Sequence, residues 1–389
     1  MDKQQQLNFL SLFTGAGGLD LGLEAAGFRC IGSVEINEIA HQTIKRNRPS
    51  WQRYNAMDIN SIANTITPQC LGLKKKGELD LIAGAPPCQP FSTAGQWAKA
   101  GRRGLNDSRA RTLDSFLAIV ARLEPKLAIL ENVPGFKSEG GLQLVAEVLE
   151  NCGYYVSSKV VECSLYGIPQ KRRRLILVAS RKPSFEWELG KECTRNTWDA
   201  LHNVKPQEKC YASGKWANLL PTIPEGENYL WHSSVGGGEE IFGNRTRFWS
   251  FLLKLAKDKP AWTLAASPGP ATGPFHWDNR PLTPLEALRI QTFPKSWKLQ
   301  GNRREQIRLI GNATPPLLGE RIGRALTAHL GVASKKGTYK YGVAKAKTPL
   351  IISEHTIELP DEYLHLVGKK EKHPGAGLGP APRNTTLSS

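Results

Sequence analysis

The chain has 389 residues, more than a single domain usually holds, which favours one large domain and one smaller one. Its content of 40% hydrophobic and 22% charged residues is that of a soluble globular protein, and no run is long and apolar enough for a signal peptide or a membrane span. The formal net charge of +17 favours a polyanionic partner, nucleic acid first and an anionic membrane surface second.

Residues 7–180 alternate short apolar runs with longer amphipathic stretches, a pattern typical of a parallel α/β sheet. The predicted strands are Asn8–Phe13, Cys30–Glu35, Leu79–Gly84, Leu127–Glu131, Tyr155–Val161 and Leu175–Ala179. Apolar spacing near 3.6 residues predicts helices near 18–26, 37–47, 112–123 and 141–151. The predicted fold is therefore α/β and doubly wound.

The composition changes after about residue 181. Segment 181–279 holds seven of the ten tryptophans, many turn residues and three consecutive glycines at 236–238. Strand–helix alternation is hard to find in it. We interpret this segment as a smaller, irregular and partly β domain with its own core.

Regular signals return in the last quarter of the chain. A helix is predicted over Leu282–Gln291, opened by Thr283-Pro284 with Glu286 in the capping position, and another over Pro316–Leu330. Beyond residue 331, Lys/Gly/Pro-rich stretches surround one β-like patch at Leu350–Leu359, and the end looks disordered. We expect four parts: a first domain over 1–180, the smaller domain over 181–279, a return to the first domain over 280–330, and a partly disordered extension over 331–389.

The seven cysteines are widely scattered, and no two of them form a CxxC pair. An odd number without paired spacing supports neither a disulfide framework nor a zinc site, so we expect no bound metal. A reducing cytosol follows. There, any conspicuous cysteine is a candidate for chemistry.

The glycine-rich run from Phe13 to Gly18 follows the first predicted strand and precedes a helix. Glycines in such a turn let a ligand approach backbone N–H groups at the helix start. Glu35 ends the second strand, where a carboxylate can accept both hydroxyls of a ribose, and Asp58 can reach an adenine amino group. The spacing is not GxGxxG, which favours an adenosyl ligand over a dinucleotide. The alternative is a simple turn with two surface acids.

Cys88 is the most conspicuous cysteine. It follows Pro86 and Pro87 in a loop that leaves a buried strand, and the prolines stiffen this loop and present the side chain rigidly. The carboxyl end of a parallel strand is where open α/β sheets bind ligands. Nearby basic groups can lower the pKa of a thiol in such a place. The alternative, a buried structural cysteine, is disfavoured by this context.

Glu131 ends another predicted strand, so its carboxylate should face the same crevice as Cys88. Directly after the apolar run Leu127–Leu130, a carboxylate is costly to bury unless it has a partner or carries a proton. The alternative is a helix-capping or surface acid.

A basic cluster, Lys171 to Arg174, precedes the last predicted strand of the first domain. If this cluster is extended, Arg172 and Arg174 point to one face and Arg173 to the other. By itself, such a cluster is usually a solvated or phosphate-contacting edge.

Taken together and in this order, the motifs resemble those of the cytosine-5 methyltransferase family. The matching segments are FTGAGG, GAPPCQPFS, ENV, QKRRR, Arg280–Pro294 (RPLTPLEALRIQTFP) and Gly311–Pro316 (GNATPP). The resemblance covers roughly 8–180 and 280–326, and segment 181–279 stands in the place of the family's target-recognition domain. It implies a Rossmann-like methyltransferase fold that uses S-adenosylmethionine, in an enzyme of the bacterial restriction–modification type.

The resemblance also implies roles for individual residues. Those implied to bind S-adenosylmethionine are Phe13, Gly15, Gly17, Leu19, Glu35, Asp58, Pro87 and Asn312. Those implied to act on the cytosine are Cys88, Glu131, Arg172 and Arg174, with Gln89 and Ser92 as candidate DNA contacts. Two positions depart from the family's pattern: Thr112 replaces an apolar cofactor contact, and Thr314 stands where Val is common.

The chemistry of the family explains these residue types. C5 of cytosine is too electron-poor to attack a sulfonium methyl group unaided, and addition of the Cys88 thiolate to C6 makes C5 enamine-like. Charge developing at N3 must be neutralised, which we expect of a protonated Glu131, with Arg174 positioning the base. The base that removes the C5 proton is not identified. Because C6 is stacked inside a duplex, base flipping is implied.

The 181–279 segment contains Arg245 and Arg247 near glycine-rich loops, and arginine can read guanine edges or meet phosphates. We expect these arginines to contact double-stranded DNA, whereas most aromatic residues of the segment form its own core. The enzyme is expected to be a monomer in the bacterial cytosol or nucleoid, with any restriction endonuclease encoded separately. The alternatives are an RNA (tRNA) cytosine-5 methyltransferase and a DNA-binding regulator without turnover.

Overall fold

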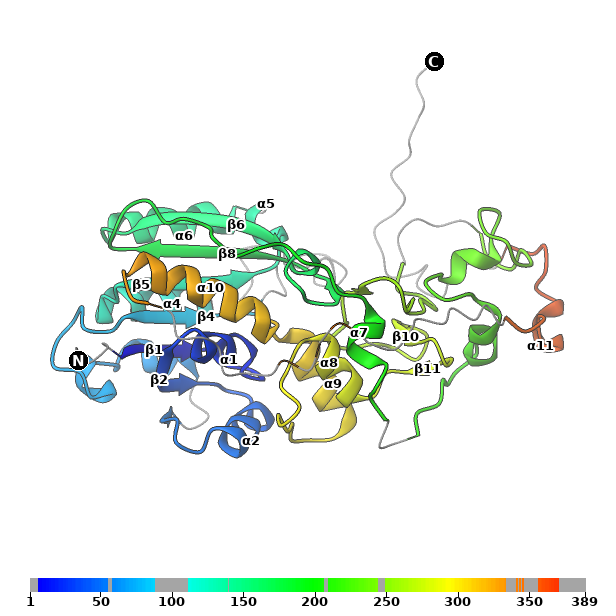
Figure 1. Cartoon of the computed structure of the whole chain (residues 1–389), viewed down its shortest axis with the longest axis horizontal. Coiled ribbons are helices and arrows are strands. Elements are labelled where there is room, and N and C mark those ends of the chain that lie inside the picture. The colour runs from blue at the N-terminus through cyan, green and yellow to red at the C-terminus, as the bar shows by residue number, and fades with distance from the viewer. Residues whose placement is uncertain are drawn as a thin grey trace, which may run out of the picture.

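A computed structural model describes the chain over residues 6–54, 58–87, 111–138, 140–205, 209–243, 249–333, 341, 343, 345 and 356–370 (Figure 1). Among the predicted site residues, those outside this described part are Cys88, Gln89, Ser92, Arg245 and Arg247. The other predicted site residues lie within it, so their surroundings can be compared with the predictions.

A seven-stranded sheet forms the centre of the large domain, with the strand order β3-β2-β1-β4-β5-β8-β6. Its strands are β1 (Leu7–Leu12), β2 (Phe28–Val34), β3 (Arg53–Tyr54), β4 (Leu81–Gly84), β5 (Leu127–Asn132), β6 (Tyr155–Glu162) and β8 (Arg173–Ser180). All six predicted strands are confirmed to within a few residues. The sequence analysis misses β3, because two residues carry no periodic signal.

One strand departs from the expected parallel arrangement. β8 pairs antiparallel with both β5 and β6, whereas β3, β2, β1, β4 and β5 pair in parallel. Hydrophobic patterning reports burial rather than strand direction, so the sequence could not distinguish the two cases. As a consequence, β8 begins at the same edge of the sheet at which β5 ends.

Alternating side chains of the central strands divide between two cores on opposite faces of the sheet. In β1, Phe9 belongs to the first core and Leu10 to the second. In β5, Ile129 and Leu130 divide in the same way. β4 and β5 are buried along their whole length, as expected for strands covered by helices on both faces.

Helices cover both cores. The first core receives residues from α1 (Gly18–Ala25), α2 (Glu38–Asn47), α8 (Pro284–Ile290), α9 (Arg303–Asn312) and α10 (Pro316–His329). The second receives residues from α3 (Ile59–Ala63), α4 (Arg111–Leu123), α5 (Gly135–Ser138) and α6 (Gly141–Asn151). Every predicted helix is confirmed, including the reciprocal cap of Thr283 and Glu286 at the start of α8. The short helices α3 and α5, and α9, were not predicted.

Residues 280–330 return to the large domain through a close helix pair. The backbones of α1 and α10 touch, since a Cβ atom on Gly22 would lie 2.3 Å from the backbone nitrogen of Glu320. A side chain at Gly22 would therefore separate the two helices. This contact brings the segment between α9 and α10 to the carboxyl edge of the sheet, where β1, β4 and β5 end.

The remaining elements are short. The 3₁₀ helices are η1 (Pro68–Leu71), η5 (Cys163–Leu165), η6 (Ala217–Thr222) and η7 (Tyr229–His232), and the short α-helices are α7 (Thr197–Leu201) and α11 (Asp361–Leu364). Two strand pairs complete the fold: β7 (Gln170–Lys171) with β9 (Ala261–Trp262), and β10 (Phe275–His276) with β11 (Arg280–Pro281). A third core, formed by Trp216, Tyr229, Phe242 and Phe251 among others, lies apart from the first two. We call the described residues of 209–279 and 356–370 the small module; α11 lies at its far end (Figure 1).

The packing of residues into the three cores does not follow the boundaries that the composition predicts. Trp187, Leu189 and Leu201 follow residue 181 but pack against the first core of the large domain. Conversely, Tyr363 and Leu366, from the predicted extension, belong to the third core. The predicted β-like patch is wrong where it can be examined: residues 356–359 form no strand, and 350–355 lie outside the described residues.

Candidate active site

A cavity of about 570 Å³ opens at the carboxyl edge of the sheet. The segments that follow β1, β2, β4 and β5 line it, together with the start of β8 and the connection between α9 and α10. This is the edge at which open α/β sheets place their ligands. Several motifs that lie far apart in the sequence therefore meet around one space.

The glycine-rich turn forms one wall of this cavity. Phe13, Gly15 and Gly17 all have positive φ, between 54° and 79°, so the chain reverses tightly before α1 begins. A Cβ atom on Gly18 would lie 2.0 Å from the carbonyl oxygen of Thr314, which shows how closely this turn approaches the α9–α10 connection. Because Gly18 has no side chain, the turn and this connection can meet, and both line the cavity.

Glu35 is held firmly beside this turn. Its Oε2 accepts a hydrogen bond from the backbone N–H of Gly15 at 2.7 Å, and its Oε1 accepts one from Asn37 at 2.7 Å. Burial raises the pKa of Glu35, and the hydrogen bonds from Asn37 and Gly15 act in the opposite direction. The carboxylate is thereby fixed in orientation before any ligand arrives.

Most residues predicted to bind the cofactor line this cavity: Phe13, Gly15, Leu19, Glu35, Pro87 and Asn312. Gly17 and Asp58 are not among the lining residues. The Asp58 carboxylate instead caps α3, accepting from the backbone and side chain of Asn60 at 2.8 to 3.1 Å. The sequence analysis missed Ile36, which lines the cavity with 64% of its surface exposed; its place directly after Glu35 was the available signal.

Glu131 and Arg174 form an ion pair in the wall of the same cavity. Arg174 Nε lies 2.8 Å from Glu131 Oε1, and both side chains are largely buried. Because β8 runs antiparallel to β5, its first residues lie beside the end of β5, with Asn132 opposite Leu175. Pro87, the residue before Cys88, lines this cavity too. The structure thus brings two predicted catalytic residues, Glu131 and Arg174, to the same cavity as Pro87, the residue before the third, Cys88.

Arg172 has a different environment. It is fully buried, and its Nη2 donates to the carbonyl oxygens of Gly311 and Ala313 at 3.1 and 2.9 Å. The predicted division of the basic cluster is confirmed, since Arg172 and Arg174 turn inward and Arg173 is exposed. The guanidinium of Arg172 therefore supports the backbone on both sides of Asn312.

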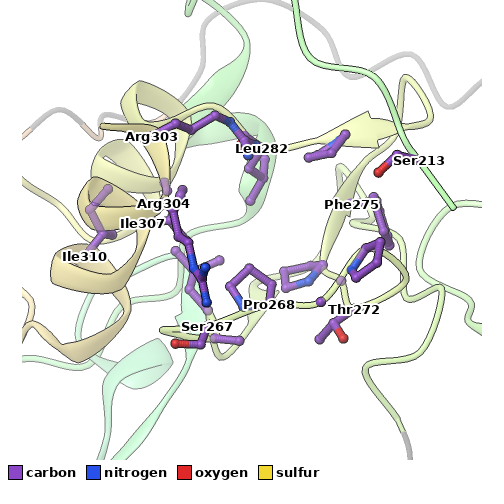
Figure 2. A pocket seen from close by; sticks show the side chains of 18 of the residues that line it. Ser213, Ser267, Pro268, Thr272, Phe275, Leu282, Arg303, Arg304, Ile307 and Ile310 are labelled. Atoms are coloured by element: carbon purple, nitrogen blue, oxygen red, sulfur yellow. The ribbon is translucent and has the colours of Figure 1, made fainter. Parts of the chain in front are cut away.

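A second cavity, of about 630 Å³, lies between α9 and the 264–275 segment of the small module (Figure 2). Its lining is largely apolar, with Pro268, Phe275 and Ile307 among its residues. Two arginines of α9 border it: Arg303, which donates to the carbonyl oxygen of Leu282 at 2.8 Å, and the exposed Arg304. Sequence reasoning did not find this cavity.

Among the described residues, no group of three or more His, Cys, Asp or Glu side chains is placed to hold a metal ion. Within the same part of the chain, no helix is both long and apolar enough to cross a membrane.

Comparison with known proteins adds independent findings. Residues 7–328 match the model of the C-5 cytosine-specific DNA methylase family. The type II methyltransferase M.SacI of Streptomyces achromogenes is 33% identical over 376 residues, spanning 86% of this chain and 96% of that protein. M.Sau96I of Staphylococcus aureus is 31% identical over 352 residues, spanning 84% and 77%. The S. pombe Dnmt2 methyltransferase structure shares the fold, with a TM-score of 0.61 and 18% identity over 84% of this chain and 99% of that one.

Proposed function

The chain belongs to the C-5 cytosine-specific DNA methylase family, and from this premise we propose how its residues act. It is a DNA (cytosine-5)-methyltransferase of the type II, restriction–modification class. We propose that its substrate is a cytosine flipped out of a specific duplex sequence and that its methyl donor is S-adenosylmethionine. The observation that carries this proposal is the Glu131–Arg174 pair, which shares one cavity with Pro87 and Glu35.

The first step is covalent. The Cys88 thiolate forms a bond to C6 of the cytosine, and the electrons of the C5–C6 double bond move into the C4–N3 system. Glu131 transfers a proton to N3, which neutralises the developing charge and leaves C5 nucleophilic as part of an enamine. Attack by Cys88 without this proton would build an anion on the ring. The two residues therefore act together.

Arg174 orients the acid. Its Nε lies 2.8 Å from Oε1 of Glu131, and this ion pair places the guanidinium charge directly beside the carboxyl group at the end of β5. Charge-assisted contacts of this kind are geometrically specific, and an arginine can also direct a donor to the base carbonyl. Pre-orientation matters, because a misplaced proton donor loses much of its catalytic effect.

The cavity suits an adenosyl ligand. Bound S-adenosylmethionine supplies an electrophilic methyl group to C5 and leaves as a neutral thioether. The carboxylate of Glu35 is the candidate acceptor for ribose hydroxyls, Ile36 and Phe13 offer apolar contacts, and the glycine turn exposes backbone N–H groups. Asn312, the last residue of α9, lines the same cavity. A volume of about 570 Å³ is in the range of small-molecule cofactor sites.

The cycle ends by elimination. A base removes the C5 proton, its electron pair restores the C5–C6 double bond, and Cys88 leaves as a thiolate. Glu131 recovers the N3 proton, so the enzyme returns to its initial state. The base is not assigned to a residue.

The small module is proposed as the DNA-reading part, as expected for segment 181–279. Arg245, Arg247, Gln89 and Ser92 remain candidate DNA contacts. We add Arg304, because it is exposed beside the cavity between α9 and the small module. The net charge of +17 supports a duplex partner. A monomer, a separately encoded endonuclease and a cytosolic location complete the proposal.

A duplex containing 5-fluorocytosine tests the covalent step, since fluorine at C5 cannot leave as a proton and the adduct persists. We expect the wild type to form a methylated adduct with this duplex and Cys88→Ala to form none. Glu131→Gln should form adduct about 10²–10⁴ times more slowly. Glu124→Gln serves as control and should behave as wild type, because the half-exposed Glu124 pairs with Lys76 and does not line this cavity. An adduct formed by Cys88→Ala would overturn the assignment.

A further inference from the structure

Asp20 is a buried acid that the proposed chemistry does not use. It lies in the first turn of α1, directly after the glycine-rich turn, with only 2% of its surface exposed. It nevertheless lines the 570 Å³ cavity that also contains Glu35 and Asn312. A carboxylate in such a place is costly unless something compensates its charge.

The surroundings of Asp20 supply little compensation. Its hydrogen bonds come from the Ser11 side chain and from its own backbone N–H, and the charged groups that act on it, Glu24 and Glu35, are themselves acids. The thiol of Cys30, on β2, lies within electrostatic reach as well. Burial, aided by Glu24 and Glu35, raises the pKa of Asp20 to about 7.

Neighbouring acids are matched by cations while Asp20 is not. Glu24, one turn further along α1, pairs with Arg48 at 2.8 Å and accepts a hydrogen bond from the indole of Trp51 at 2.9 Å. Glu131 pairs with Arg174. Among the described residues, no Lys, Arg or His side chain forms an ion pair with Asp20. The missing positive charge is therefore one that a ligand in the cavity can provide.

We propose that the Asp20 carboxylate receives the α-ammonium group of the methionine part of S-adenosylmethionine. This inference rests on the proposed use of that cofactor. The ligand carries two positive groups, the sulfonium and the ammonium. The ammonium is the one that can donate several hydrogen bonds to a carboxylate, and charge-assisted hydrogen bonds are the stronger kind. Asp20 would thereby select ligands that carry an amino-acid end.

Two ligands distinguish binding of the ammonium group from a structural role of Asp20 that would affect every ligand of the cavity. S-adenosylhomocysteine keeps the ammonium group but lacks the sulfonium charge, and 5′-methylthioadenosine lacks both while keeping adenine and ribose. Isothermal titration calorimetry on the full chain should show that Asp20→Asn weakens S-adenosylhomocysteine at pH 8 by about tenfold or more. Its affinity for 5′-methylthioadenosine should stay within about twofold of wild type.

The pH dependence gives a second signature. Pairing with an ammonium requires ionised Asp20, so below pH 7 binding must also remove a proton from it. Wild-type affinity for S-adenosylhomocysteine should be about tenfold weaker at pH 6 than at pH 8. Asp20→Asn should lose this difference. Glu35 faces the same cavity, and its titration would change the affinity for 5′-methylthioadenosine as much as that for S-adenosylhomocysteine. Measuring both ligands at pH 6 and pH 8 therefore separates the effect of Asp20 from that of Glu35.

Glu24→Gln is the matched control, because it removes a carboxylate from the same helix that already has a cationic partner. It should keep the wild-type affinity for S-adenosylhomocysteine at pH 8 and still bind more weakly at pH 6, because burial, the largest cause of the raised pKa of Asp20, is unchanged. Thermal melts verify that each variant is folded. Equal losses for both ligands in Asp20→Asn would indicate a structural role and overturn the inference. Unchanged binding of S-adenosylhomocysteine would overturn it as well. A wild type that binds neither compound would refute the proposed cofactor, and this inference with it.

Discussion

Arg174 Nε lies 2.8 Å from Oε1 of Glu131, although their strands are separated in sequence by α5, α6, β6, η5 and β7. The antiparallel pairing of β8 with β5 creates this contact, because it places the first residues of one strand against the last residues of the other. A parallel strand in that position would have put its first residues at the opposite edge of the sheet. The direction of β8 thus determines whether the proposed acid has a cationic partner.

Replacing Arg174 by Lys tests that contact. Lysine keeps the charge but loses the planar guanidinium, so the positive charge beside Glu131 would no longer be held in one place. We expect the single-turnover rate of methyl transfer to fall by about tenfold or more, with affinity for S-adenosylhomocysteine close to wild type. Arg173→Lys, at the exposed neighbouring position, is the control. If Arg174→Lys matched it in rate, the positioning role would be refuted.

Replacing Arg172 by Ala should affect stability first. The change leaves two buried carbonyl oxygens, those of Gly311 and Ala313, without the Nη2 donor, and it empties space in a fully buried site. We expect a loss of roughly 3 kcal/mol in the free energy of unfolding, measured by urea denaturation.

Affinity for S-adenosylhomocysteine should also fall in Arg172→Ala, because the supported backbone carries Asn312 into the cofactor cavity. Arg173→Ala should change stability by less than about 0.5 kcal/mol. A stable Arg172→Ala variant with normal ligand binding would show that this support is dispensable, and would return attention to a direct role of Arg172 at the cytosine.

Replacing Tyr363 by Ala tests the contribution of the C-terminal segment. Its ring stacks on Trp216 with centroids 5.8 Å apart, and its hydroxyl donates to the carbonyl oxygen of Lys215 at 2.8 Å. Loss of a buried aromatic ring costs about 3–5 kcal/mol. We expect weaker DNA binding and a lower melting temperature, while affinity for S-adenosylhomocysteine is retained because that cavity lies in the large domain.

Leu364→Ala is the matched control in the same short helix, since Leu364 is 54% exposed. It should be nearly neutral in both stability and DNA affinity. Equal effects of the two substitutions would contradict a specific role of Tyr363 in the third core.

Replacing Arg304 by Ala tests the cavity between α9 and the small module. A side chain that neutralises one phosphate contributes about one to the slope of log affinity against log salt. We expect Arg304→Ala to weaken binding of all duplexes similarly and to reduce that slope by roughly one. Lys75→Ala, in the loop before β4, should leave the slope unchanged. An unaltered slope in Arg304→Ala would exclude a phosphate contact.

The sequence predicted the large domain well, for identifiable reasons. Its strands are continuous apolar runs and its helices carry strong 3.6-residue spacing, as in α4 and α6, so local patterning alone locates them. The cap of α8 was visible in Thr283, Pro284 and Glu286. In contrast, β3 and α3 are too short to have a period. The small module has few regular elements, so burial of its aromatic residues could be expected but not their arrangement.

The sequence by itself determined the family and the order of the motifs and predicted the reactive groups, because these depend on residue type and spacing. Tertiary structure alone decided which groups meet. It paired Arg174 with Glu131 through strand direction, turned Arg172 to the Gly311 and Ala313 carbonyls, and engaged Asp58 in a helix cap. It also buried Asp20 in the wall of the proposed cofactor cavity and placed Tyr363, from the predicted C-terminal extension, in the third core. Contacts between distant residues follow from the packing of whole elements, and no local pattern encodes that packing.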